Sequence, residues 1–135
     1  MSNNLFDKTT DALATSLRLR QIRHKVTSSN IANAETPGFK AKKVDFEDAL
    51  ASALDIDGLN KLETDNDKHF VTGGGSNPTA EIYDNPDAAV SNDGNTVDME
   101  KEMAALSENS ILYKTALHLI NKKMAALKYA IGEGK

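Results

Sequence analysis

A repeating pattern of apolar residues at the C-terminal end of this 135-residue chain constrains its fold more than any other feature. Ten positions follow one another at alternating spacings of four and three residues, and nine of them are apolar. The apolar positions are Met99, Met103, Leu106, Tyr113, Leu117, Ile120, Met124, Leu127 and Ile131. Because the interval contains no Pro or Gly, the pattern predicts one long helix from Asp98 to Ile131 with a coiled-coil-like packing seam.

A second apolar stripe adjoins this seam on a helical wheel and is interrupted only by Lys123. Its members are Leu112, Ala116, Leu119, Ala126 and Ala130. One stripe is expected to pack against a helix of the same chain and the other against a neighbouring copy; a wide buried face in a larger monomer is the alternative. Acidic residues at the start of the helix and lysines towards its end suit the helix dipole, and Gly132 and Gly134 are expected to end the helix.

The N-terminal segment from Leu5 to Asn33 is predicted to form the second long helix. Four residues at strict heptad spacing define its apolar stripe, namely Leu5, Ala12, Leu19 and Val26. Leu13, Leu17 and Ile22 broaden the stripe. The packing seam expected on this helix consists of Leu5, Leu13, Leu17 and Leu19. Pairing of the two terminal helices gives a mainly α fold, a coiled-coil-like hairpin.

A turn at Thr36-Pro37-Gly38 is expected to follow the N-terminal helix. Pro disfavours helical geometry in the residue before it, and Pro-Gly suits the centre of a type II turn. After the turn, an amphipathic stretch that contains Val44, Phe46, Leu50 and Leu54 predicts one more helix of about three turns.

An acidic, loop-rich insert over residues 51–91 separates the two helical regions. Residues 55–96 carry nine acidic and two basic side chains, whereas residues 1–43 carry eight basic and three acidic ones. Gly73-Gly74-Gly75 and two Asn-Pro pairs indicate turns, and the flanking runs 69–71 and 80–83 are each barely long enough for a short strand. We expect residues 1–50 and 92–135 to form one helical domain, with a small irregular or β-containing insert between them.

The sequence offers no recognisable catalytic or ligand-binding constellation. The absence of Cys excludes disulfides, thiolate chemistry and Cys-based metal sites. The three His residues have no partners at metal-ligand spacing. An EF-hand loop centred on Gly94 would have Ala89 at its first position, where an acidic ligand is required. The glycine triplet also lacks the Lys of a phosphate-binding loop. We expect no enzyme activity, no metal and no cofactor.

Charge and hydropathy restrict the partners of the chain. The basic stretch at Arg18, Arg20, Arg23 and Lys25 has no aromatic stacking residues, and the pI is about 5.3. A solvated helix face or a charged subunit interface therefore explains it better than a nucleic-acid site. No apolar run reaches the length of a membrane span, and the N-terminus lacks the apolar centre of a secretory signal. We expect no membrane span and no cleaved signal peptide, which leaves export by a dedicated machine open.

Two stretches resemble the flagellar rod, hook and hook-associated axial proteins. Residues 29–41, with the sequence SNIANAETPGFKA, resemble the N-terminal motif of that family. Residues 93–100, with the sequence DGNTVDME, resemble the part of the family pattern that opens the C-terminal helix. In so short a chain, the pattern is most similar to the proximal rod members, except that Phe39 stands where Tyr is common. The resemblance covers residues 1–50 and 92–131 and leaves the insert unaccounted for.

The resemblance implies a structural subunit that stacks helically into the periplasmic rod of the bacterial flagellum. It also implies export by the flagellar type III apparatus. The implied partners are other copies of the chain, other rod proteins, the membrane-supramembrane ring and the rod-base adaptor protein. We place the subunit joint at Asn30, Ile31, Asn33, Thr36, Pro37, Gly38 and Phe39. An internal helix-to-loop cap is the alternative for this segment, and a non-polymerising helical adaptor or export chaperone is the alternative for the chain.

Overall fold

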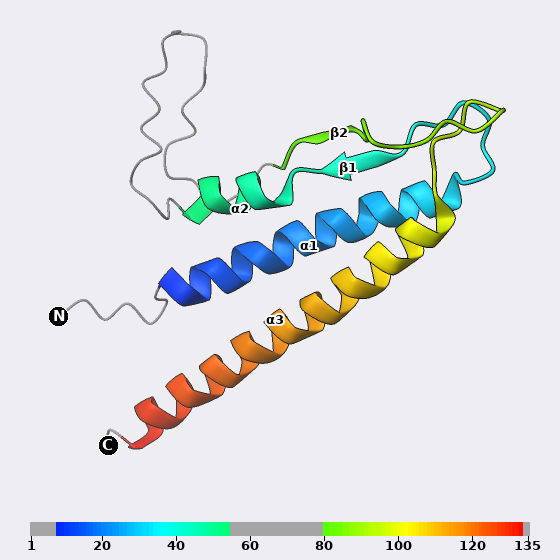
Figure 1. Ribbon diagram of the computed structural model, residues 1–135. Helices are drawn as coiled ribbons and strands as arrows, with labels where there is room; N and C mark the ends of the chain where they lie inside the picture. Colours follow the sequence, from blue (N-terminus) through cyan, green and yellow to red (C-terminus); the bar gives the residue numbers. More distant parts are fainter. Residues whose placement is uncertain (1–7, 55–79, 134–135) are drawn as a thin grey trace, which may run out of the picture.

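The computed structural model describes residues 8–54 and 80–133 of the chain. The elements in chain order are α1 (Lys8–Ala32), β1 (Lys42–Val44), α2 (Phe46–Leu54), β2 (Ile82–Asp84) and α3 (Met99–Glu133). The fold is mainly α, as predicted, with two long terminal helices and a small two-stranded sheet (Figure 1). Leu5 and the predicted strand over residues 69–71 lie outside the described residues.

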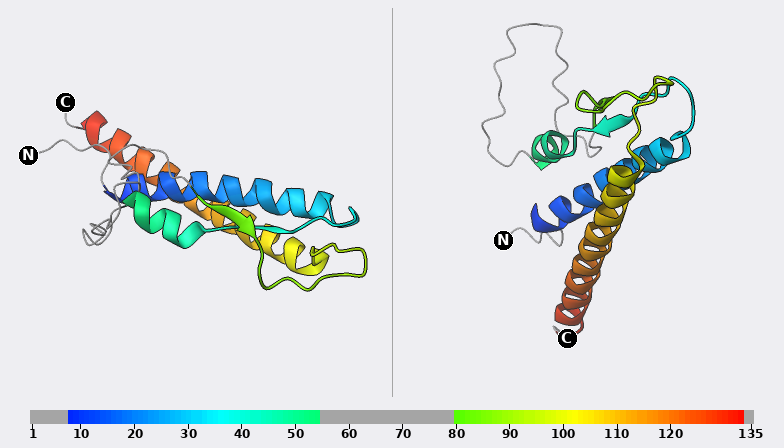
Figure 2. Two further views of the ribbon diagram at one scale, coloured as in Figure 1. Left: turned by 90° about the horizontal axis from the view of Figure 1, so that it is seen from above. Right: turned by 45° about the vertical axis from the view of Figure 1, so that its right-hand side comes forward.

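The two long helices run antiparallel to each other and form a hairpin (Figure 1). The first turn of α1 and the last turns of α3 lie at one end of the molecule, and the connection between the helices lies at the other end. In Figure 1, α1 lies between α3 on one side and the strands with α2 on the other, and Figure 2 shows the same elements from two further directions. Among the described elements, α3 packs against α1 alone. The hairpin is therefore covered on only one of its sides.

Helix α3 begins and ends close to the predicted positions. Asp98 caps its N-terminus, because the Asp98 carboxylate accepts a hydrogen bond from the Lys101 amide at 3.2 Å. At the other end the described part of the helix continues through Gly132 to Glu133, so Gly132 does not end it as expected, and Gly134 lies outside the described residues. The uninterrupted apolar periodicity and the good helix formers in this segment explain its length.

The small sheet pairs a predicted strand with one that the sequence analysis missed. β1 and β2 are antiparallel, with Lys42 opposite Asp84 and Val44 opposite Ile82. Strand β2 overlaps the predicted run over residues 80–83. Val44 belongs to β1 instead of the predicted short helix, which begins at Phe46. Buried Val44 and buried Phe46 alternate with half-buried Asp45, a pattern that fits an extended strand leading into a helix.

The apolar core lies between α1 and α2. It consists of Leu19, Phe46 and Ala49, with Ile22, Leu50 and Ala80 packed around it. Leu19 has no exposed area at all. Within α3, in contrast, Asn109 and Ala116 are the buried residues among those whose side chains are described. The predicted seam of α1 thus contributes Leu19 to a core that α2, and not α3, completes.

Candidate functional site

Asn30 fastens strand β1 to the end of α1. Its side chain is 1% exposed, and its amide forms two hydrogen bonds with the backbone of Lys42. The side-chain nitrogen donates to the Lys42 carbonyl at 2.8 Å, and the side-chain oxygen accepts from the Lys42 amide at 2.9 Å. Because β2 pairs with the other edge of β1, Asn30 acts as the hydrogen-bonding neighbour that a third strand would supply.

Asn95 closes the turn that follows α1. Its side-chain nitrogen donates to the carbonyl oxygens of Asn33 at 2.9 Å and Thr36 at 2.8 Å. Its side-chain oxygen accepts a hydrogen bond from the Val97 backbone amide at 2.7 Å. The backbone amide of Asn95 donates to the Asp93 carboxylate at 3.1 Å. Asn95 is only 2% exposed. One buried side chain therefore ties the exit of α1 to the entry of α3.

The backbones of the two motifs also bond to each other directly. The Gly38 amide donates to the Asp93 carbonyl at 2.9 Å, and the Thr96 amide donates to the Phe39 carbonyl at 3.0 Å. The buried Thr96 hydroxyl accepts from the Ala41 amide at 2.8 Å. The stretches 29–41 and 93–98, which are far apart in the sequence, thus form one hydrogen-bonded unit, here called the motif junction.

Two glycines lie back to back in the motif junction. Gly38 has a φ of 74° and Gly94 a φ of 81°, both in the region that L-residues with a side chain rarely adopt. A Cβ atom added to Gly94 would lie 3.4 Å from the Gly38 Cα. The Lys40 ammonium donates to the Gly94 carbonyl at 3.1 Å, beside this close approach. The motif junction therefore depends on glycine at both positions.

A polar contact holds the two long helices in register. The Asn109 side chain, 3% exposed, donates to the Arg20 carbonyl at 2.9 Å and accepts from the Arg20 guanidinium at 3.4 Å. One turn further along, the Gln21 amide donates to the Tyr113 hydroxyl at 3.2 Å. Because a buried polar pair tolerates few alternative alignments, these bonds favour one register of α3 on α1.

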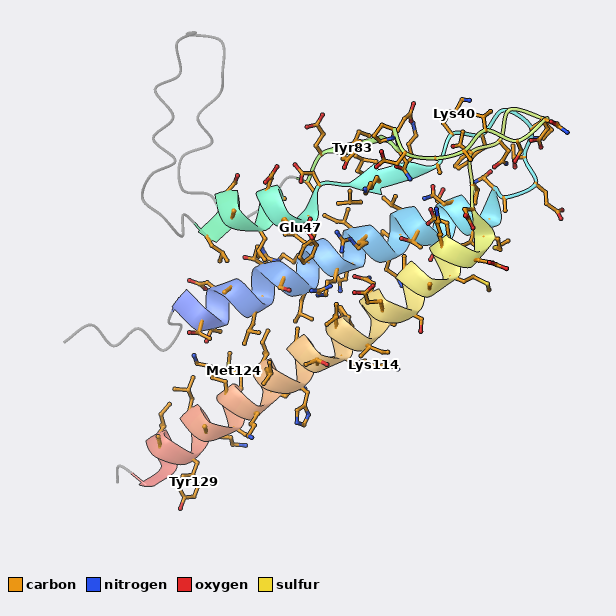
Figure 3. The ribbon with its side chains drawn as sticks, in the orientation of Figure 1. Lys40, Glu47, Tyr83, Lys114, Met124 and Tyr129 are labelled. Carbon is orange, nitrogen blue, oxygen red and sulfur yellow. The ribbon has the colours of Figure 1, made fainter. Side chains whose placement is uncertain are left out.

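Two arginines of α1 stack on the same aromatic ring. The guanidinium carbons of Arg20 and Arg23 lie 4.7 and 4.5 Å from the centre of the Phe46 ring. Arg23 also pairs with Glu47 at 3.7 Å (Figure 3 labels Glu47). Burial lowers the pKa of Arg20 from its ordinary value, and the positive charge of Arg23 lowers it further. The cluster places two guanidinium groups, and so two positive charges, next to α2.

The structure separates the predicted subunit-joint residues into three groups. Asn30 is buried and Asn33 half-buried, and both bond within the chain, as the capping alternative requires. Thr36, Pro37 and Gly38 are exposed at the turn. The remaining members, Ile31 and Phe39, are half-buried.

The predicted seam of α3 is also divided by exposure. Met99, Met103, Leu117 and Ile131 are exposed, from 39% to 60%. The half-buried members are Leu106, Tyr113, Ile120, Met124 and Leu127. On α1, Leu13 and Leu17 are half-buried and Leu19 is buried.

Sequence reasoning missed Asn95 and Asn109 as contact residues. The family-like motif around Asn95 was a signal for the first, and Asn109 sits beside Ser110, the polar break in the apolar repeat.

Neither a metal cluster nor a membrane helix is found among the described residues. Within 8–54 and 80–133, no three His, Asp or Glu side chains gather as they would around a metal ion. None of the helices in these ranges combines the length and the hydropathy needed to cross a bilayer.

Comparison with known proteins identifies the family. Residues 11–40 match the family model described as flagella basal body rod protein. A flagellar basal body rod protein FlgB of Aeromonas hydrophila is 40% identical over 126 residues, which cover 93% of this chain and 94% of that protein. The FlgB of Bacillus subtilis is 34% identical, covering 98% of this chain and 99% of its own length, and that of Escherichia coli is 33% identical, covering 87% and 88%. These comparisons give no support to the adaptor or chaperone alternative. The chain therefore belongs to the FlgB family of flagellar basal body rod proteins.

Proposed function

We propose that this chain is a non-catalytic structural subunit that assembles, with copies of itself and with other rod proteins, into the proximal rod of the flagellar basal body. One observation carries the proposal: α3 exposes most of its large apolar side chains. Eight of them are between 38% and 67% exposed. They are Met99, Met103, Ile111, Leu112, Leu117, Leu119, Tyr129 and Ile131. Figure 3 shows Tyr129 on the side of α3 that points away from α1.

This exposed apolar surface favours association with other subunits over the free monomer. Full burial of one Leu, Ile or Met side chain contributes about 1.5–3 kcal/mol, and contiguous exposed apolar patches mark interaction sites. Because α1 covers only one stripe of α3, the remaining circumference is available to helices of neighbouring subunits. The predicted seam residues that remain exposed, such as Met103 and Leu117, become intersubunit contacts in this proposal.

The motif junction supplies the joint of the subunit. Its buried hydrogen bonds from Asn30, Asn95 and Thr96 fix the angle at which the chain leaves α1 and enters α3. Thr36, Pro37 and Gly38 then form an exposed, rigid tip that contacts the neighbouring subunit. Internal capping and subunit contact are thus two functions of one segment, performed by different side chains.

The proposal includes further partners and a location, which membership in the family supports. In this proposal the rod lies in the periplasm, and the membrane-supramembrane ring and the rod-base adaptor protein are its neighbours. The chain reaches it through the flagellar type III export apparatus without a cleaved signal peptide. The names of the relatives, all flagellar basal body rod proteins, support this placement.

The test is cryo-electron microscopy of basal bodies purified from the source bacterium. We expect α1 and α3 to be traceable in the proximal rod, with the exposed apolar side chains of α3 packed against helices of other subunits. Basal bodies from cells that lack this chain serve as the control and should lack the same density. Rods that are complete without the chain would overturn the proposal.

A further inference from the structure

A groove between α1 and α3 carries positive charge and no carboxylate. It has a volume of about 440 Å³ and eight lining residues. Four of these are basic residues, namely Arg20, His24, Lys25 and Lys114, and the other four are uncharged. Figure 3 labels Lys114 in the middle of α3. We call this feature the basic groove.

The cations of the basic groove form no ion pair within 4.0 Å among the described residues, although Glu108 and Glu47 lie near enough to Arg20 to oppose the lowering of its pKa by burial. The guanidinium of Arg20 donates at 3.4 Å to a neutral acceptor, the Asn109 amide oxygen. The ion pairs found in the described part of the chain join Arg23 to Glu47, Lys42 to Asp84 and Lys101 to Asp98. Arg20, Lys25 and Lys114 take part in none of these pairs. Lys25 and Lys114 are exposed and form no ion pair among the described residues, so their charges can pair with an anionic group of another molecule.

The same chain exposes a segment of opposite charge. Residues 80–93, which contain β2 and the turn after it, carry four carboxylates and no basic residue. All four, Glu81, Asp84, Asp87 and Asp93, are exposed. Asp84 pairs with Lys42 and Asp93 accepts a bond from Asn95, so Glu81 and Asp87 keep their charge for an external partner. We call residues 80–93 the acidic arm.

Within one copy, the β2 part of the acidic arm lies apart from Lys114, although Asn85 lines a neighbouring pocket together with Arg20 and Asn109. In Figure 1, α1 lies between β2 and the middle of α3, and among the described elements β2 contacts only β1. Tyr83, on the arm, lies on the opposite side of α1 from Lys114 (Figure 3). A contact between the β2 part of the arm and Lys114 therefore joins two molecules.

We propose that the basic groove of one subunit binds the acidic arm of a second copy of this chain, with Glu81 and Asp87 facing Lys25, Lys114 and Arg20. The contact is heterologous, because it joins two different surfaces, and contacts of this kind generate open helical assemblies. It rests on the proposed assembly function and names a polar surface that orients one subunit on the next. Like charges placed against each other would oppose the same contact.

A charge-swap experiment tests this pairing. Cells of the source bacterium that lack the native copy express Lys25→Glu/Lys114→Glu, Glu81→Lys/Asp87→Lys, or all four substitutions together, and rods per cell are counted in purified basal bodies. We expect each double variant to reduce assembled rods about tenfold or more, which corresponds to one like-charge clash per contact. The fourfold variant, in which the charges are exchanged, should recover most of the assembly.

Matched controls separate this proposal from the assembly function itself. Asp11→Lys/Asp48→Lys makes the same charge change as the arm variant at exposed carboxylates of α1 and α2, outside the arm, the groove and α3, and should assemble as the wild type does. Far-UV circular dichroism of each purified variant checks that it folds. Wild-type chain absent from the rod would overturn the assembly function. Wild-type chain in the rod together with normal assembly of both double variants, or failure of the fourfold variant to recover, would overturn the arm-to-groove contact alone.

Discussion

Buried asparagine side chains make many of the long-range connections in this molecule. Asn30, Asn95 and Asn109 are each at most 3% exposed, and each bonds to the backbone of another segment. The asparagine side-chain amide has two donor hydrogens and an oxygen with two lone pairs. It can therefore replace both a missing backbone donor and a missing backbone acceptor. Because a buried polar group without a partner is costly, each asparagine fixes one local arrangement.

Asn95→Ala should lower the free energy of unfolding by about 1–3 kcal/mol, the usual cost of leaving buried partners unsatisfied. The substitution removes the donor to Asn33 and Thr36 and the acceptor for Val97. Urea denaturation followed by circular dichroism measures the change. The exposed Asn92→Ala is the matched control and should stay within about 0.5 kcal/mol of the wild type. Equal stabilities of the two variants would contradict the role given to Asn95.

The same Gly→Ala change should have opposite signs at two positions. Gly38→Ala forces a side chain into a φ of 74° and should destabilise the chain by about 1–2 kcal/mol. Gly132 lies inside α3 with nothing within 4 Å of an added Cβ, so Gly132→Ala should stabilise the helix by up to about 1 kcal/mol. Thermal unfolding of the two variants, compared with the wild type, provides the measurement. Two shifts of the same sign would be inconsistent with this reading of the backbone.

At the scale of the elements, α3 is a long helix attached by a narrow polar and small-residue stripe. Asn109 and Ala116 are its buried residues among those with described side chains, and the Gln21–Tyr113 bond lies between them. The small side chain of Ala116 permits a close approach, while the hydrogen bonds of Asn109 select the register. The apolar core between α1 and α2 is separate, so the hairpin and the core are stabilised by different contacts.

Asn109→Ala should weaken the attachment of α3 by about 1–2 kcal/mol, because the Arg20 guanidinium and carbonyl lose their partner. Hydrogen exchange should show faster exchange of α3 amides and little change in α2, which does not contact α3 among the described elements. Ser110→Ala, next to Asn109 and half-buried, serves as the control and should leave exchange in α3 near the wild-type rate. Uniform acceleration across α1, α2 and α3 would instead indicate a single cooperative unit.

At the scale of the whole molecule, the residues that stabilise the subunit and those proposed to join subunits are different. Leu19 is fully buried in the core, whereas Ile111 on α3 is 62% exposed. The free subunit therefore gains much from Leu19 and little from Ile111. In an assembly, Ile111 gains the burial that the free subunit does not offer.

Leu19→Ala should therefore lower mainly the stability of the monomer, whereas Ile111→Ser should impair mainly rod assembly. Leu19→Ala should cost about 2–5 kcal/mol of monomer stability, the range for large-to-small changes in a core. Ile111→Ser should change monomer stability by less than about 0.5 kcal/mol and yet reduce rod assembly. Denaturation of purified chains and rod counts in cells measure the two effects. Normal rods with Ile111→Ser would argue against a subunit contact at this position.

The sequence by itself determined the two long helices and the place where α3 begins, since apolar periodicity and the residues at helix ends act over a few neighbouring positions. The long terminal helices and the motif resemblance are found as predicted. The tertiary structure decided which segments pack against each other. It placed Val44 in a strand, gave Leu19 to a core with α2, and brought Asn95 against Asn33 across 62 residues of chain. Such pairings produce no periodic pattern in the sequence. They depend on buried polar groups and partners that are far apart in the chain and meet only in the folded molecule.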